Sequence, residues 1–190
     1  MREDSFKYHL VNQAHLQPGQ RILDLGCGTG TLTILIKQQQ PASEVTGLDG
    51  DHHVLEIARI KAKDAGVDIT WDVGMVFHML YPTESFDRVL SCLVIHHLTT
   101  ENKRRAFQEV LRILKPGGEF HFIDFGKPRD PLMALISLGI GRLEEAGDNM
   151  KGLISVFLRD AGFNEVNECA HFKSIFGELI HYQVKKLDRR

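Results

Sequence analysis

The segment Ile22–Gly30, with the sequence ILDLGCGTG, constrains the fold more than any other part of the chain. A short apolar run leads directly into Gly26, Gly28 and Gly30, and a stretch with helical character follows from Thr31. Glycine lets a backbone turn tightly and approach a ligand closely, while the helix that follows points its N-terminus at the same place. We therefore expect a strand–loop–helix unit whose loop holds a dinucleotide or a nucleoside with a charged tail.

Strand and helix patterns alternate along most of the chain. Besides residues 21–25, strands are expected at 44–48, 68–73, 86–94, 119–125, 165–172 and 175–185, with helices at 31–40, 51–65, 152–161 and one capped by Thr99 or Thr100. Such alternation implies parallel pairing with right-handed crossovers. We predict an α/β fold with a doubly wound, Rossmann-like, mostly parallel seven-stranded sheet, helices on both faces and an antiparallel C-terminal strand.

Two local patterns refine this prediction. The helix at 51–65 should turn one stripe to the core, and that stripe comprises Val54, Ile57, Ala58, Ala62 and Ala65. The sequence KPGG at Lys115–Gly118 should end the preceding helix and separate it from the strand at 119–125.

The chain contains no repeat, low-complexity tract or long linker, so residues 1–190 are expected to form a single domain. Residues 1–20 should contribute a short N-terminal helix. Residues 127–150 carry prolines and glycines around the apolar run LMALISLGIG, which suits either a lid over a ligand or one face of a packed helix.

Two acidic residues help to identify the ligand of the glycine loop. The three glycines have the spacing G-x-G-x-G, whereas a dinucleotide fingerprint needs a glycine where Thr31 stands. Asp24, before the loop, suits a cationic ligand better than a pyrophosphate. Asp49, nineteen positions after Gly30, can accept hydrogen bonds from ribose hydroxyls, although an acid at a strand end is often only a solvated loop residue.

Four ordered segments, ILDLGCGTG, GLDGD, FDRVLSCLVIHHL and LRILKPGGEFHFIDF, extend from about Arg21 to Phe125. Together they resemble the successive motifs of class I S-adenosylmethionine (SAM)-dependent methyltransferases, in particular the small-molecule branch that includes the ubiquinone and menaquinone biosynthesis enzymes (methyltransferase type 11). The resemblance implies methyl transfer from SAM to a small-molecule acceptor, with S-adenosylhomocysteine (SAH) as product. The apolar run within 127–150 would suit a hydrophobic acceptor.

The resemblance also implies roles for the matching residues. The cradle for the methionine part of SAM consists of Gly26, Cys27, Gly28 and Gly30. Asp24 reaches the α-amino group, and Asp49 holds the ribose. Gly50 lies beside the adenosine, and Ser91 offers its main-chain carbonyl near the amino group.

One position departs from the family pattern. Relatives carry an acid after the third strand that accepts a hydrogen bond from the adenine amino group, where this chain has Met75 within Gly74-Met75-Val76. A thioether is a much weaker acceptor, but it can lie against an aromatic ring, and the main chain of Met75 and Val76 can meet the adenine edge. We therefore predict that the adenine is held mostly by packing.

Three residues at one edge of the sheet are candidates for catalysis. His96 and His97 follow the strand at 86–94, and Asp124 ends the strand at 119–125, where ligands bind in open α/β sheets. Adjacent side chains point apart, so one histidine should face the pocket, either as a base or as a residue that only shapes it. Asp124 could equally be an ordinary loop acid. The histidines lack the i, i+4 spacing of a helical chelate, so no metal is expected.

Composition restricts the partners further. The chain has 23 basic and 25 acidic residues, so its net charge creates no positive electrostatic potential that would attract nucleic acid. Its longest apolar stretch is far shorter than the roughly 20 residues of a membrane span, and we expect a cytoplasmic protein without stable membrane insertion. The short segment before the first strand leaves the pocket open or completed by a second subunit of a homodimer. An NAD(P)-dependent oxidoreductase and a non-catalytic SAM-binding module remain as alternatives.

Overall fold

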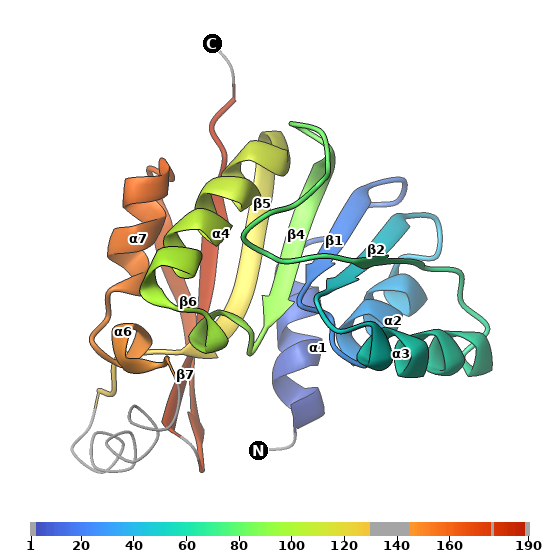
Figure 1. Ribbon diagram of the computed structural model, residues 1–190, viewed down its shortest axis with the longest axis horizontal. Helices are drawn as coiled ribbons and strands as arrows, with labels where there is room; N and C mark the ends of the chain where they lie inside the picture. Colours follow the sequence, from blue (N-terminus) through green and yellow to red (C-terminus); the bar gives the residue numbers. More distant parts are fainter. Residues whose placement is uncertain (1–2, 130–144, 176, 189–190) are drawn as a thin grey trace.

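The computed structural model describes residues 3–129, 145–175 and 177–188, and a seven-stranded sheet runs through it in the order β3-β2-β1-β4-β5-β7-β6 (Figure 1). The strands are β1 (Arg21–Leu25), β2 (Glu44–Asp49), β3 (Thr70–Val73), β4 (Phe86–Cys92), β5 (Leu114–Phe125), β6 (Val166–Ser174) and β7 (Gly177–Lys185). Strands β1 to β5 pair in parallel, whereas β7 is antiparallel to both β5 and β6. The predicted fold class is confirmed.

Helices connect and cover the strands. They are α1 (Glu3–Gln13), α2 (Thr31–Gln39), α3 (His52–Asp64), α4 (Thr100–Ile113), α6 (Gly147–Met150) and α7 (Ile154–Ala161), with a 3₁₀ turn η1 (Ile95–His97). The Thr99 hydroxyl accepts a hydrogen bond from the main-chain N–H of Asn102 and so caps α4, as one of the two expected caps. Among the helices of the described residues, none combines the length and apolar character that crossing a membrane requires.

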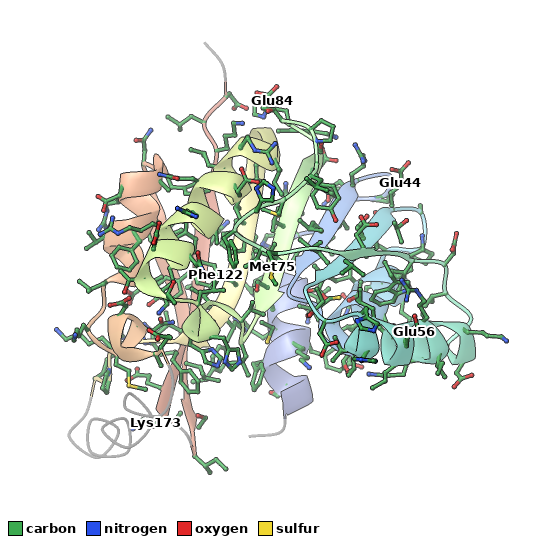
Figure 2. The ribbon with its side chains drawn as sticks, viewed as in Figure 1. Glu44, Glu56, Met75, Glu84, Phe122 and Lys173 are labelled. Atoms are coloured by element: carbon green, nitrogen blue, oxygen red, sulfur yellow. The ribbon has the colours of Figure 1, made fainter. Side chains whose placement is uncertain are left out.

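A hydrophobic core lies on each face of the sheet. Leu23 and Leu25 of β1 belong to the core shared with α4 and α7, whereas Ile22 belongs to the core shared with α1 and α2. Successive side chains of a strand point to opposite faces, so β1 is apolar throughout because both of its faces are covered. On β5, Phe122 (Figure 2) is fully buried, and its ring centroid lies 6.0 Å from that of Phe107 on α4.

Two of the local predictions need correction. Ala58 and Ala62 of the predicted stripe are buried, but Ile57 is 48% exposed and Ala65 is exposed, while Leu55, which was not predicted, is buried. Successive helical residues are about 100° apart, so Ile57 points away from the sheet when Leu55 points toward it. The second correction concerns KPGG. It follows the end of α4, as predicted, but it does not separate that helix from the next strand, because β5 already begins at Leu114, which pairs with Phe86.

The segments predicted as the N-terminal helix and the lid are described only in part. Helix α1 occupies Glu3–Gln13 of the expected 1–20 region and packs on the α2 face of the sheet. Of the expected lid at 127–150, residues 130–144 lie outside the described residues, while α6 forms the end of that segment. Helix α6 contacts η1 and β5, so this part of the segment lies at the carboxyl edge of the sheet.

Candidate cofactor-binding site

The glycine loop joins β1 to α2 at the centre of the sheet. The strand order reverses here, since β2 and β3 lie on one side of β1 and β4 and the later strands lie on the other. In open α/β sheets, ligands bind at such a switch point, outside the carboxyl ends of the strands. Gly26, Gly28 and Gly30 all have positive φ, at 71°, 52° and 76°. The N–H groups of Gly26 and Cys27 donate to the Leu48 carbonyl at 2.8 and 2.9 Å, which ties the loop to the end of β2.

Two adjoining cavities flank this loop. The first has a volume of about 380 Å³. Its lining comprises Lys7, Asp24, Gly26, Cys27, Gly28, Thr29, Thr31, Leu32, Cys92, Leu93 and Val94. The second has a volume of about 390 Å³ and is lined by Gly26, Gly28, Asp49, Gly50, Gly74–Phe77, Leu93, Val94, His97 and Leu98. Gly26, Gly28, Leu93 and Val94 border both cavities, so one elongated ligand could occupy the two together.

Asp24 gives the first cavity a buried acid. Its side chain is 1% exposed, and Oδ2 accepts a hydrogen bond of 2.6 Å from the Thr33 hydroxyl. Burial raises the pKa of Asp24 to about 7, and the nearby Lys7 opposes that rise. A carboxyl group and an ammonium group therefore border one cavity, as a ligand with an amino-acid end requires.

Asp49 borders the second cavity and also stabilises the loop. Its Oδ2 accepts from the Gly28 N–H at 2.8 Å, and its Oδ1 accepts from the Asp51 N–H at 3.0 Å. A carboxylate has about four lone-pair positions, so two remain to accept from the hydroxyls of a ribose. Gly50 lies next to it, and a Cβ at Gly50 would lie only 3.0 Å from Met75 Sδ.

The far wall of the second cavity is apolar. It includes Met75, Val76 and Phe77, and Met75 is 52% exposed on the segment between β3 and β4 (Figure 2). Asp72, the carboxylate closest to Met75 in the sequence, accepts a hydrogen bond of 2.8 Å from the Tyr81 hydroxyl and lines a different cavity. This wall offers an apolar surface on which a flat ring can pack, and the main chain of Met75 and Val76 can meet the edge of that ring.

Ser91 lies inside the sheet. It is buried in β4, and its hydroxyl donates to the Leu25 carbonyl at 2.8 Å. The lining of the first cavity starts one residue later, at Cys92. A contact from the Ser91 carbonyl to a ligand therefore stays a prediction, while the side chain links β4 to β1.

His96, His97 and Asp124 meet at the edge of the sheet, as expected, but their surroundings differ. Asp124 is fully buried: Oδ2 accepts from the N–H groups of Val94 and Ile95 at 3.1 and 2.7 Å, and Oδ1 accepts from His96 Nδ1 at 2.9 Å. His96 is also buried, whereas His97 is exposed and borders the second cavity. The two histidine rings have centroids 3.9 Å apart. One histidine thus borders the cavity, but the two side chains do not point apart as expected, because they lie in a 3₁₀ turn and not in an extended strand.

Leu93 and Val94 are site residues that the sequence analysis did not identify. Leu93 has a positive φ of 60°, an unfavourable conformation for a non-glycine residue, and such outliers gather at functional sites. A Cβ at Gly26 would lie 2.5 Å from Val94 Cγ1, so only glycine fits at that position. The sequence analysis placed both residues at the end of the strand expected at 86–94, whereas β4 ends at Cys92. The available signal was their position at the carboxyl end of that strand.

Lys103 is a buried charged residue, outside the lining of the two cavities, that the sequence analysis also missed. It is fully buried on α4, and its ammonium group donates to the Glu145 carbonyl and lies 3.6 Å from Asp148 Oδ2. Burial lowers the pKa of Lys103. Its position on the same helix face as Phe107 and Val110 was the signal, because a lysine there must find a buried partner.

No group of three or more histidine, cysteine, aspartate or glutamate residues that could hold a metal occurs in the ranges that the structure describes. No disulfide joins the three cysteines, of which Cys27 is buried, Cys92 partly buried and Cys169 exposed.

Comparison with known proteins decides the family. Residues 22–118, about half of the chain, match the family model described as a methyltransferase domain. The chain belongs to the class I SAM-dependent methyltransferases. It is 35% identical over 127 residues to the demethylmenaquinone methyltransferase of Symbiobacterium thermophilum, covering 64% of this chain and 50% of that protein. It is 32% identical over 128 residues to the ubiquinone/menaquinone biosynthesis C-methyltransferase of Ralstonia pickettii, covering 67% and 52%.

This methyltransferase chain thus spans about half the length of those two relatives. Solved structures agree on the fold. The [4+2]-cyclase SpnF superposes with a TM-score of 0.80 at 18% identity, covering 98% of this chain and 82% of that one. A SAM-dependent methyltransferase of Methanosarcina mazei superposes with a TM-score of 0.76 at 20% identity, covering 94% and 98%. At these identities the likeness concerns the fold alone.

Proposed function

We propose that this chain binds SAM across the two cavities and transfers its methyl group to a small-molecule acceptor. The observation that carries the proposal is the pair of cavities on either side of the glycine loop. The first is bordered by an acid and a cation, and the second by a second acid and an apolar wall. These features match the zwitterionic tail, the ribose and the base of SAM.

Each part of SAM has a partner in this proposal. Asp24 pairs with the α-amino group and Lys7 with the carboxylate, because both border the first cavity. Asp49 accepts from the ribose hydroxyls. The adenine packs against Met75 and Val76. A dinucleotide is disfavoured, since its pyrophosphate would lie beside the buried Asp24 carboxyl, and this argues against an oxidoreductase.

Bound SAM supplies a methyl group that its sulfonium already makes electrophilic, so the protein has mainly to position the acceptor and exclude water. An electron pair of the acceptor would form the new bond to the methyl carbon as the carbon–sulfur bond breaks and leaves its electrons on sulfur. His97 borders the second cavity and is the residue we propose to orient the acceptor or take its proton. His96 and Asp124 act as positioning residues, since they lie behind His97 in the core.

A hydrophobic acceptor fits this proposal best. Phe77, Leu93 and Leu98 border the second cavity together with His97. The two relatives whose printed names specify menaquinone or ubiquinone biosynthesis support a hydrophobic acceptor as well. A cytoplasmic location and a homodimer stay predictions.

Calorimetric titration with SAM and SAH tests the cofactor assignment on wild type, Asp49→Asn and the control Asp64→Asn. Asp64 is exposed at the end of α3, away from the cavities. Asp49→Asn should weaken both ligands about tenfold, which corresponds to ~1.4 kcal/mol, and the control should bind as wild type does. A folded wild-type protein that binds neither ligand would refute the proposal. SAM binding without SAH production on a panel of hydrophobic and polar acceptors would favour a non-catalytic SAM-binding module.

A further inference from the structure

Lys61 lies on α3, outside the motifs that define the family, yet it contacts the glycine loop. Its ammonium group donates to the Thr31 hydroxyl at 2.7 Å and lies 3.3 Å from the Thr29 hydroxyl. Both threonines line the first cavity. We infer that Lys61 is a positioning residue that prepares these two hydroxyls to bind the carboxylate end of the cofactor's amino-acid tail. The inference rests on the proposed function.

The chemistry of the contact explains how a lysine behind the loop can act on a ligand in front of it. An ammonium group has three N–H donors and no acceptor, so each threonine hydroxyl must use a lone pair toward Lys61. The proton of each hydroxyl is then available to donate elsewhere. Hydrogen bonds with a charged partner are strong and polarise the group they reach. Lys61 therefore turns Thr29 and Thr31 into donors, which is what a carboxylate requires.

The same arrangement divides the first cavity by hydrogen-bonding character. Asp24, on the other side of the loop, presents a carboxyl group that already accepts from Thr33. Thr29 and Thr31 present hydroxyl donors, and Lys7 adds a cation from α1. A zwitterionic amino acid is thus oriented in one direction, with its ammonium group toward Asp24 and its carboxylate toward the threonines.

Close packing between α3 and the loop holds Lys61 at this distance. A Cβ at Gly30 would lie 2.9 Å from the Ala58 Cβ and 2.6 Å from Trp71 Cη2, so the absence of a side chain at Gly30 lets α3 approach. Ala58 and Lys61 are three positions apart on α3 and therefore lie on neighbouring parts of its surface. Trp71 is the only tryptophan of the chain, so its fluorescence reports on the integrity of the loop.

Ligand truncation separates this role from a general effect on the loop. SAH carries the amino-acid tail, whereas 5′-methylthioadenosine has the same nucleoside and sulfur without it. We expect Lys61→Met to weaken SAH about tenfold and to leave 5′-methylthioadenosine within about twofold, as measured by calorimetry. The control Lys63→Met changes an exposed lysine of the same helix and should alter neither affinity. Thr31→Val should weaken SAH as well, and combining it with Lys61→Met should add little.

Each other outcome has a definite meaning. Equal loss of both ligands in Lys61→Met, with altered Trp71 fluorescence, would overturn the inference, because Lys61 would then only support the loop. Unchanged SAH affinity in Lys61→Met would overturn it too. Failure of the proposed function looks different, since the wild-type protein itself would then bind neither SAH nor 5′-methylthioadenosine.

Discussion

Asp124 offers the most quantitative test of how the site is built. Its carboxylate accepts from six donors, three on each oxygen: Val94 N, Ile95 N and His96 N on Oδ2, and His96 Nδ1, Phe125 N and Asn149 Nδ2 on Oδ1. In Asp124→Asn, one oxygen becomes an NH₂ group of nearly the same size. Whichever oxygen is replaced, three hydrogen bonds are lost around a fully buried side chain, and among the donors involved the Asn149 amide keeps another acceptor, the Phe125 carbonyl.

The magnitude follows from these three lost hydrogen bonds. A buried donor without a partner costs about 1–3 kcal/mol, and one of the three contacts on Oδ2 is long at 3.4 Å, so we expect Asp124→Asn to lower the free energy of unfolding by about 3 kcal/mol. With a urea m-value of about 2 kcal/mol/M, the unfolding midpoint should fall by roughly 1.5 M. Equilibrium urea unfolding, followed by circular dichroism, measures both.

A matched control is Asp160→Asn, which removes an acid whose side chain is half exposed and paired with Arg104 at 2.5 Å. A surface pair of this kind should change the free energy of unfolding by at most about 0.5 kcal/mol. If Asp124→Asn also lost less than about 1 kcal/mol with an unchanged m-value, Asp124 would not hold the turn that carries His96 and His97.

Four further predictions concern the two cavities and the sheet. Met75→Asp should tighten SAM binding about tenfold by supplying a carboxylate acceptor for the adenine amino group, and a calorimetric titration without gain would contradict packing as the main contact. Gly28 and Gly30 both have positive φ, so alanine strains the backbone at either position, but a Cβ at Gly28 meets nothing within 4 Å whereas one at Gly30 also meets Trp71 and Ala58; Gly28→Ala should therefore weaken SAM and lower the melting temperature less than Gly30→Ala does, and equal melting temperatures of the two variants would disprove the difference. Burial raises the pKa of Asp24 to about 7, so its ionised fraction and SAM affinity should fall about tenfold from pH 8 to pH 6, and calorimetry on Asp24→Asn should show weak binding that does not change with pH. Burial lowers the pKa of His181 to about 3, so the unfolded chain binds the extra proton below pH 6.5 and His181 lowers stability by about 2 kcal/mol from pH 7 to pH 5; burial also lowers the pKa of His121, so urea unfolding of His181→Gln should show a fall that is smaller by about 2 kcal/mol than that of wild type.

The sequence predicted the elements well where one local rule decided them. The strand at Arg21–Leu25 has the predicted bounds because apolar residues and glycines delimit it without help from distant residues. The error at Ile57 has a tertiary cause, since Ala58 faces inward as predicted but the packing of α3 on the sheet buries Leu55 on one side of it and leaves Ile57 on the other side exposed. The start of β5 at Leu114 depends likewise on pairing with another strand.

The candidate site could be located from the sequence but not resolved into roles. Motif spacing identified Asp24 and Asp49, and both border the cavities. Asp124 binds main-chain N–H groups, whereas His97 borders a cavity. Both facts depend on the path of the three-residue turn η1, which no periodicity in the sequence encodes. Lys61 was out of reach for the same reason, because its contact with Thr31 spans 30 positions of sequence.

These contacts explain how the site can be shaped before any ligand arrives. Asp49 ties the loop at Gly28 to the end of β2, Lys61 ties Thr31 to α3, and Asp124 ties η1 to the end of β5. In each contact a charged side chain forms hydrogen bonds with main-chain N–H groups or hydroxyl groups. The three side chains come from different elements, namely two strands of the sheet and the helix α3. Ordering a loop at the moment of binding costs affinity, so a glycine loop already held by Asp49 and Lys61, next to a turn held by Asp124, retains more of its interaction energy for the ligand. The glycine loop is therefore only part of the site, because contacts from the surrounding elements determine whether the loop is ready to bind.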